Sequence, residues 1–596
     1  MPHRPALIPF AYLLGCFAAA ASLLAQPVGA PVMPLSELHA GQKGEVWTVF
    51  KGSKSEPFAV EVTGILQNAL GPGKNLILCE LTDPRIQPMG AVAGMSGSPL
   101  YIDGKVVGVL AYQIQRFETV RYAGFTPIAD MLEVSALPSS LAPIGNPLPI
   151  PIKGASASER RTAQLDASAQ LHPFAPVFSL GGLSPDVAAL LTPQFQALGL
   201  NSIALGGNTT GAASEVPAIN VALKPGDVVA AALAIGDISI AATGTVSHVD
   251  GQRILAFGHP MLSLGATELP MVAAEVVAIL PSQLNSVKLS NTGQIIGSFS
   301  QDRLSGIYGE IGRQPALVPV DIELPARLNR KALHFSVVRQ EQILPVIAAT
   351  GLAQAVSGSN EAGFAKGIRL TSTVKFPGET PLVFSQLYPG PQGFRQGVGE
   401  FVSKLQQCLY NPFERIFPEH IHFSVEENAD VPIGFIDSVQ LSRNEASPGT
   451  NVTVTIAWHD FQQAARTESL DLSIPAAWAG KKLEVVLVPG ALLDELTGRD
   501  KTESVLDHTN FSEYLAALRQ SRPTDGLYLA VLEKTRLFSD QRSLTPDLPG
   551  SLERIARTAD EARFQRRDAA AVLWENKLMP GRLFTAQFRK PLTVTD

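Results

Sequence analysis

The loop at residues 94–99, Gly-Met-Ser-Gly-Ser-Pro, is the stretch that most constrains how this chain can fold. Gly94 and Gly97 allow a tight turn that side chains would block, and Pro99 fixes the direction in which the chain leaves it. Such a turn can point the amides of Gly94 and Ser96 at one spot, where they would stabilise a developing oxyanion. Ser96 is therefore a candidate nucleophile. Gly/Ser-rich turns also precede strands in many β proteins, so the loop alone leaves a purely structural role open.

Asp83 lies upstream of this loop, in the sequence Leu-Thr-Asp-Pro-Arg, at the end of an apolar strand expected at residues 75–81. A carboxylate at a strand end can orient a catalytic histidine. An aspartate before a proline also commonly caps a turn, and this role is the simpler one for Asp83 considered alone. Downstream of the loop, Asp103-Gly104 is typical of a tight hairpin between two strands.

His259 is the candidate general base. A hairpin is expected at residues 244–251, and its return strand at residues 253–257 ends at Gly258-His259-Pro260. A general base needs a rigid support, partial shielding from water and a pKa near the working pH, and the end of a buried strand provides the first two. His248 lies inside the hairpin and is expected on the strand surface. A histidine at a strand end can also be purely structural.

Together, these motifs resemble those of the SpoIVB (sporulation stage IV protein B) serine peptidases, over about residues 44–132 and 226–325. The resemblance implies a chymotrypsin-like double β-barrel, with Ser96 as nucleophile, His259 as base and Asp83 as acid. In that family the histidine block precedes the serine block, whereas here the order is reversed. A triad depends on geometry and not on chain order, so the permutation is tolerable.

The acid of this triad is the least constrained assignment. In two-barrel peptidases the acid usually lies on the barrel of the histidine, whereas Asp83 is close in sequence to the serine. Asp302 and Asp250 therefore remain alternatives. The PDZ-like domain of such signalling peptidases is not recognisable in this sequence, so the resemblance gives no expectation of how a regulator or substrate is recognised.

Composition indicates a mainly β protein of several units. The chain has 596 residues, 45% of them hydrophobic and 17% charged, and its 50 Gly and 45 Pro favour turns and short strands. The net charge of −7 without a basic block gives no reason to expect a nucleic-acid partner. Cys79 and Cys408 are expected in the core, since they cannot provide a disulfide scaffold or a Cys-rich zinc site.

The changes in composition along the chain predict its division into units. A basic start and an apolar run indicate a secretory signal at residues 1–25, and hence export to the periplasm or the exterior. Contact with a membrane is expected only if Cys16 carries a lipid. The predicted units are a half-barrel with the serine at 33–137, a Pro/Ser/Ala-rich connector at 138–217, a half-barrel with the histidine at 218–330, a mixed extension at 331–429, a β-sandwich-like module at 430–489, and a mixed α/β region at 490–596.

Glu419, His420 and His422 are the one group that invites a check for a metal site, because residues two apart on a strand face the same side. No third convergent ligand is evident from the sequence, so we predict no metal and no cofactor.

The sequence thus predicts an exported serine endopeptidase that acts on protein or peptide substrates. One alternative is a secreted binding or scaffold protein that keeps the barrels as a platform. Another is a peptidase limited to cleaving its own connector. Neither the oligomeric state nor the substrate preference is encoded in a recognisable motif.

Overall fold

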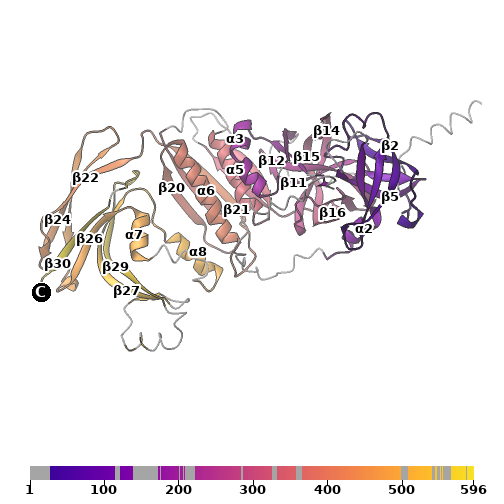
Figure 1. The fold of residues 1–596 in the computed structure, drawn as a ribbon. Coiled ribbons are helices and arrows are strands. Elements are labelled where there is room, and N and C mark those ends of the chain that lie inside the picture. The colour runs from indigo at the N-terminus through magenta and orange to yellow at the C-terminus, as the bar shows by residue number, and fades with distance from the viewer. Residues whose placement is uncertain are drawn as a thin grey trace, which may run out of the picture.

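The computed structural model describes residues 27, 29–113, 121–138, 172–174, 176–200, 202–205, 207–208, 222–282, 286–324, 332–357, 366–498, 508–539, 544–546, 551, 554, 565–585 and 587–596. The units follow one another along an elongated molecule, from the indigo N-terminal barrel to the C-terminus at the opposite end (Figure 1). The predicted signal and Cys16 lie outside the described residues. Among the described helices, none is long and apolar enough to cross a membrane.

The first barrel is a closed ring of strands that carries the serine loop. Its order is β4 (Pro99–Ile102), β1 (Lys43–Val49), β2 (Ser55–Gly71), β3 (Lys74–Leu81), β6 (Tyr122–Pro127) and β5 (Lys105–Gln113). The β4–β5 hairpin closes the ring, and its turn places Asp103 at φ 49° and Gly104 at φ 74°. This geometry is what an Asp-Gly hairpin turn requires. Helix α2 (Ile128–Ser135) follows β6.

The second barrel carries His259 and is also closed. Its order is β11 (Val228–Gly236), β14 (Gly265–Leu280), β15 (Val287–Arg303), β16 (Gly306–Ile311), β13 (Arg253–Ala256) and β12 (Ser239–Asp250), with a β11–β12 pairing that completes the ring. Alternate residues of its strands face the core, among them Val229, Ala231, Ile240 and Ala242. The long hairpin of β14 and β15 extends beyond the ring and reaches the first barrel, where Gly52 and Val276 pair.

The described part of the segment that joins the barrels contains short strands and two short helices. Within the range expected as a connector lie β7 (His172–Pro173), β8 (Val177–Gly181), α3 (Pro185–Leu190), α4 (Thr192–Ala197), β9 (Ser202–Leu205) and β10 (Gly207–Asn208). The sequence Ser184-Pro185-Asp186 indicates the start of a short helix, and the structure has this helix as α3, with the Ser184 hydroxyl capping its N-terminus through the Val187 amide. Strand β8 adds to β12 of the second barrel.

A mixed layer extends the second barrel's sheet. Strand β18 (Leu333–Val338) pairs with β11 and continues through β17 (Leu317–Glu323), β21 (His420–Glu427), β19 (Ile368–Lys375) and β20 (Leu382–Tyr388). Helices α5 (Ile343–Ser357) and α6 (Gly390–Leu409) cover one face of this sheet (Figure 1). Buried residues on both sides of the interface join the core of the second barrel, so the two form one packing unit.

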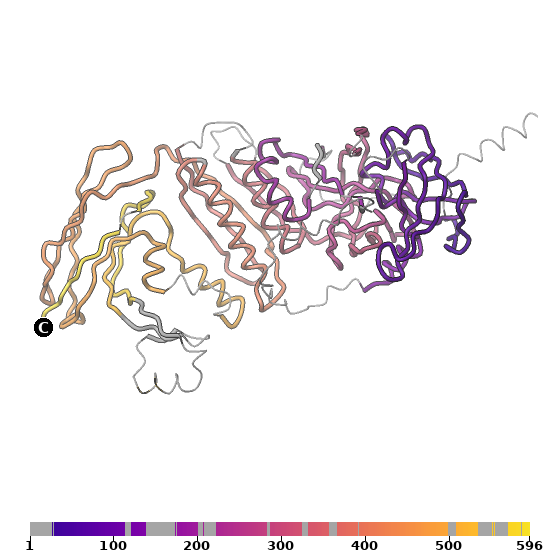
Figure 2. Tube along the Cα trace, in the orientation of Figure 1, coloured from indigo at the N-terminus to yellow at the C-terminus, as the bar shows by residue number. Residues whose placement is uncertain are grey.

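The C-terminal unit is a sandwich-like pair of sheets with two helices. One sheet contains β22 (Gly434–Leu441), β24 (Asn451–Asp460) and β25 (Arg466–Ser473), and the other β23 (Glu445–Ala446), β30 (Phe588–Val594), β26 (Lys482–Val488), β27 (Leu527–Ser539), β28 (Leu544–Pro546) and β29 (Gln565–Leu578). Helices α7 (Gly490–Thr497) and α8 (Phe511–Arg519) lie between β26 and β27 in the chain. Strands β26 and β30, in the orange-to-yellow part of the trace, run side by side (Figure 2).

The prediction of a mainly β, double-barrel fold is confirmed. The C-terminal boundaries differ from those expected. The sandwich-like module draws its second sheet from the region beyond residue 489, because β26 pairs with both β27 and β30. The sequence indicates a helix around residues 552–567, but residues 565–567 belong to β29. Strand pairing between distant segments, which no local pattern reports, decides these boundaries.

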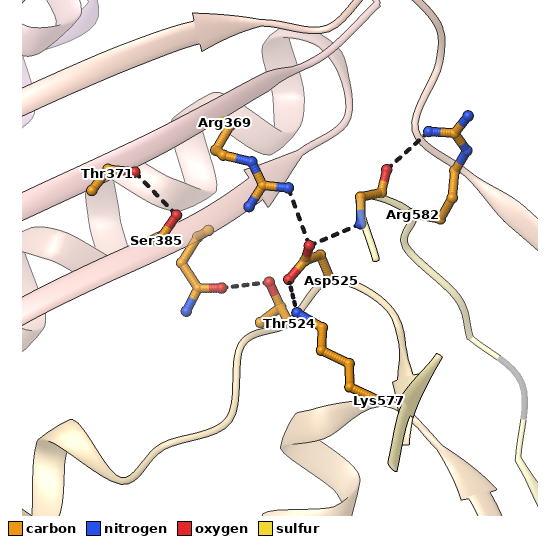
Figure 3. A network of polar contacts seen from close by, with 9 residues as sticks. Arg369, Thr371, Ser385, Thr524, Asp525, Lys577 and Arg582 are labelled. Carbon is orange, nitrogen blue, oxygen red and sulfur yellow. Dashed lines mark hydrogen bonds and ion pairs between the residues drawn. The ribbon is translucent and has the colours of Figure 1, made fainter. Parts of the chain in front are cut away.

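A buried carboxylate links the C-terminal unit to the mixed layer (Figure 3). Asp525, 4% exposed, accepts hydrogen bonds from Lys577 Nζ at 2.8 Å, Arg369 Nη2 at 3.1 Å and the Gly581 amide at 2.9 Å. Burial opposes ionisation, but these donors outweigh it and hold the pKa of Asp525 below its usual value.

We expect Asp525→Ala to destabilise the C-terminal unit by roughly 2–4 kcal/mol, because two cations and one amide lose their shared acceptor. Urea unfolding followed by tryptophan fluorescence would measure it, since Trp458, Trp478 and Trp574 all lie in this unit. Asp430→Ala is the control: Asp430 is 3.9 Å from Lys366 and well exposed, so its loss should cost less than about 0.5 kcal/mol. Equal effects of the two variants would contradict the role given to Asp525.

Candidate active site

Two glycines shape the serine loop. Gly94 and Gly97 have φ angles of +96° and +92°, a region that side chains strongly disfavour. At Gly97 space is also lacking, since a Cβ would lie 2.2 Å from the Thr245 carbonyl oxygen and 2.5 Å from the Phe257 amide nitrogen. The loop of the first barrel therefore touches the backbone of the second barrel at a point where only glycine fits.

The amides of the serine loop fall into two groups. Those of Ala93, Met95 and Gly97 donate to backbone carbonyl oxygens. Within the described part of the chain, those of Gly94 and Ser96 donate to none. Two alternate amides are thus left available, and they are the pair that the sequence predicts as an oxyanion hole. Ser96 itself is 3% exposed.

His259 follows a sharp turn at the end of β13. Phe257 and Gly258 both have positive φ angles, of 71° and 69°, and the Gly258 carbonyl oxygen accepts a hydrogen bond from the Thr126 hydroxyl of the first barrel at 2.7 Å. The imidazole is completely buried, with Nδ1 2.8 Å from the Pro260 carbonyl oxygen. Burial lowers the pKa of His259 to about 4.

The contact with Pro260 fixes the tautomer of His259. A carbonyl oxygen can only accept, so Nδ1 carries the proton and Nε2 presents its lone pair. Among the described residues, Nε2 has no hydrogen-bond partner. The imidazole is therefore neutral at pH 7 with a free Nε2, which is the protonation state from which a general base acts. Its pKa of about 4 lies below the working pH expected of such a base, because the ring is completely buried in this conformation.

The structure brings the serine loop and the histidine strand region together. The Thr245 amide donates to the Ser96 carbonyl oxygen at 2.8 Å, and the Ser247 hydroxyl donates to the Gly97 carbonyl oxygen at 2.8 Å. Both donors lie on β12, which pairs with β13, the strand that leads to His259. In this conformation Ser96 and His259 do not share a hydrogen bond.

Asp83 is engaged elsewhere. Its carboxylate accepts from the Arg85 amide at 2.8 Å, from Arg85 Nε at 3.1 Å and from Arg85 Nη2 at 3.0 Å. The hydrogen bonds from Arg85 lower the pKa of Asp83. Arg85 also lies 3.1 Å from Glu56 and over the ring of Phe50. In the part of the chain that the structure describes, no hydrogen bond or ion pair joins Asp83 to His259, and the role of Asp83 as the triad acid stays a prediction.

Asp302 supports the loop that follows His259. It is 1% exposed, and its carboxylate accepts hydrogen bonds from three backbone amides, those of Met261, Leu262 and Leu264, at 2.7 to 3.0 Å. Burial raises the pKa of Asp302, while these donors oppose the rise. Asp250, the other alternative, lies at the surface 4.0 Å from Arg253. Of the three carboxylates, Asp302 is the one tied to the histidine loop.

Lys288 is a functional candidate that the sequence analysis missed. It lies on β15, and its backbone amide donates to the carbonyl oxygen of Ala93, just before the serine loop. Its side-chain stem passes 3.0–3.3 Å from the Cβ position of Gly94. Its Nζ donates to the Thr48 hydroxyl at 2.9 Å. Burial lowers the pKa of this amine to about 7. A lone lysine in an alternating strand gives no sequence signal of such a contact.

The histidines checked for a metal site pair with carboxylates. Asp321 lies 2.6 Å from both His334 Nδ1 and His420 Nε2, and His422 Nε2 lies 3.7 Å from Glu323. Among the described residues, no group of three or more histidine, cysteine or carboxylate side chains is arranged to hold a metal ion. Cys79 and Cys408 are buried free thiols.

Comparison with known proteins bears on the serine-bearing unit. A family model described as SpoIVB peptidase S55 matches residues 15–129. The SpoIVB resemblance is confirmed. The SpoIVB-type match supports a serine peptidase, and so protein substrates. It includes Asp83 and the serine loop and ends before His259. No curated protein and no solved structure matched the chain.

We expect Lys288→Met to change how stability depends on pH. The folded amine has a lowered pKa of about 7, so the unfolded chain binds more protons than the native protein between pH 7 and 10. Wild type should gain stability with rising pH in this range, on the order of 1 kcal/mol per pH unit from this group, and Lys288→Met should lack that gain. Denaturant unfolding at pH 7 and 9 measures it. A difference between variant and wild type that does not vary with pH would contradict the buried, neutral amine.

Proposed function

We propose that this protein is an exported serine endopeptidase of SpoIVB type, in which Ser96 is the nucleophile and His259 the general base. The observation that carries the proposal is the pair of available amides at Gly94 and Ser96, on a loop bound to β12, together with a neutral imidazole that has a free Nε2 and follows the neighbouring strand β13. The family match over the serine-bearing unit supports the same chemistry. Export rests on the predicted signal at residues 1–25.

In the proposed reaction, Ser96 Oγ attacks the carbonyl carbon of the scissile peptide bond and His259 Nε2 takes the hydroxyl proton. The carbonyl oxygen becomes an oxyanion and accepts hydrogen bonds from the Gly94 and Ser96 amides. His259 then protonates the leaving amine as the C–N bond breaks, leaving an acyl group on Ser96. Water, activated by the same imidazole, hydrolyses the ester and regenerates the serine.

Ser96 and His259 share no hydrogen bond in the structure, so they must move closer together before His259 can take the proton of Ser96. The Pro260 carbonyl oxygen already holds the required tautomer. We propose that Asp302 acts as a positioning residue through the loop amides that it binds, with Asp83 kept as the alternative acid on the strength of the family motif.

Hydrolysis of an unfolded protein substrate such as casein tests the mechanism. Ser96→Ala and His259→Gln should each lower kcat by about 10⁴-fold or more, and the double variant should be little worse than either, because the two residues act as one unit. Circular dichroism and melting temperature serve as folding controls. Folded variants that hydrolyse casein at the wild-type rate would favour a binding or scaffold protein.

A second comparison separates the two carboxylates. Asp302→Asn replaces one acceptor oxygen of the histidine loop, so we expect kcat to fall by roughly 10- to 100-fold with little change in KM. Asp83→Asn weakens the contact with Arg85, so we expect it to lower the melting temperature more than kcat. The reverse order of effects on kcat would assign the triad acid to Asp83.

A further inference from the structure

Strands β7 and β8 lie on either side of the junction between the two barrels. Strand β7 pairs antiparallel with the end of β5, with Tyr112 opposite Pro173 and Gln113 opposite His172. A few residues later, β8 pairs antiparallel with β12 of the second barrel. The chain between these strands therefore spans the junction of the barrels, where the serine loop meets β12.

The edge of β5 places Phe174 next to the serine loop. One edge of β5 pairs with β6. The other edge binds β4 and the serine loop along one part and β7 along the next. Along this shared edge, the Leu110 carbonyl oxygen accepts from the Gly97 amide at 2.7 Å, and the Ala111 carbonyl oxygen accepts from the Phe174 amide at 3.0 Å. Neighbouring positions of β5 thus bind the serine loop and Phe174.

The direction of the segment is equally informative. The chain passes from His172, opposite Gln113, to Phe174, at Ala111, and so runs toward the serine loop. Of the described residues paired with this edge, Phe174 is the last before the serine loop. A polypeptide bound by strand addition in this register would offer the bond that follows that residue.

The side chain of Phe174 fills an apolar pocket beside the loop. It is 2% exposed and belongs to the same buried cluster as Val92, Met95 and Leu110. Its ring centroid lies 6.5 Å from that of His259. The ring of Phe174 therefore occupies an apolar pocket within the core of the first barrel, beside the ring of the candidate base.

We propose that residues 172–174 occupy the place of the substrate strand, so that substrates are extended polypeptides with a phenylalanine-like residue before the scissile bond. This inference rests on the proposed peptidase function. The segment blocks the groove from within the chain, in agreement with the burial of Ser96 and His259. A substrate must displace β7 from the edge of β5 and Phe174 from its pocket before it reaches the serine.

Covalent labelling of the full-length protein tests the proposal. One probe is a small alkyl fluorophosphonate, which reports only an activated serine, and the others are diphenyl phosphonates derived from phenylalanine and from lysine. Phe174→Ala empties the pocket, and Phe174→Leu keeps it filled. The control is Phe195→Ala, which removes an equally buried ring from α4. Mass spectrometry locates the adduct and gives its rate of formation.

We expect the phenylalanine probe to label Ser96 of Phe174→Ala at least tenfold faster than it labels Ser96 of wild type, Phe174→Leu or Phe195→Ala. Within Phe174→Ala, the phenylalanine probe should react faster than the lysine probe. Equal rates for all four proteins, or a preference for the lysine probe, would overturn the inference while leaving the peptidase intact. If the small fluorophosphonate labels Ser96 in none of the four proteins, the proposed function itself is overturned.

Titration of His259 by NMR gives an independent readout. Removal of the Phe174 ring should admit water to the imidazole and raise the pKa of His259 from about 4 toward its ordinary value near 6.5. Phe195→Ala should leave the pKa of His259 unchanged. An unchanged pKa in Phe174→Ala would contradict the position given to Phe174 over the candidate base.

Discussion

The close approach of the two barrels at Gly97 is the contact on which the candidate site depends. A side chain at this position would clash with the backbone of Thr245 and Phe257. Because the loop can approach so closely, β12 binds the carbonyl oxygens of Ser96 and Gly97, and the histidine strand is held in register with the serine loop. The reversed order of the two barrels in the chain does not alter this contact, since it is made between backbones.

Burial sets the electrostatics of the site more than charge does. His259 and Lys288 both have lowered pKa values because they are removed from water. The imidazole of His259 is therefore neutral at pH 7, whereas the amine of Lys288, with a pKa of about 7, is about half protonated there. A neutral imidazole with a free Nε2 is ready to accept a proton. The same burial keeps substrate out, so in the described conformation the base is neutral but the site is inaccessible. Displacement of β7 would then open the site to substrate.

The sequence predicts those parts of the molecule that local chemistry determines. The glycines around Ser96, the Asp-Gly hairpin and the turn before His259 each require a specific backbone geometry, and the structure has it at Gly94, Asp103 and Gly258. It does not predict contacts made by pairing between distant segments. The pairing of β7 with β5, the passage of Lys288 along Gly94 and the sharing of β26 by β27 and β30 depend on register, which alternating patterns leave open. The identity of the triad acid is likewise not predicted by the sequence, because the family motif favours Asp83 whereas the hydrogen bonds to the loop after His259 favour Asp302.

The structure of the protein phosphonylated by a fluorophosphonate would test the central claim most directly. The account predicts phosphorus bonded to Ser96 Oγ, with its non-bridging oxygen about 2.7–3.1 Å from the amide nitrogens of Gly94 and Ser96. It also predicts His259 Nε2 within hydrogen-bond distance of the adduct. An adduct on another residue, or one on Ser96 whose oxygen points away from both amides, would contradict an active site built from these two loops.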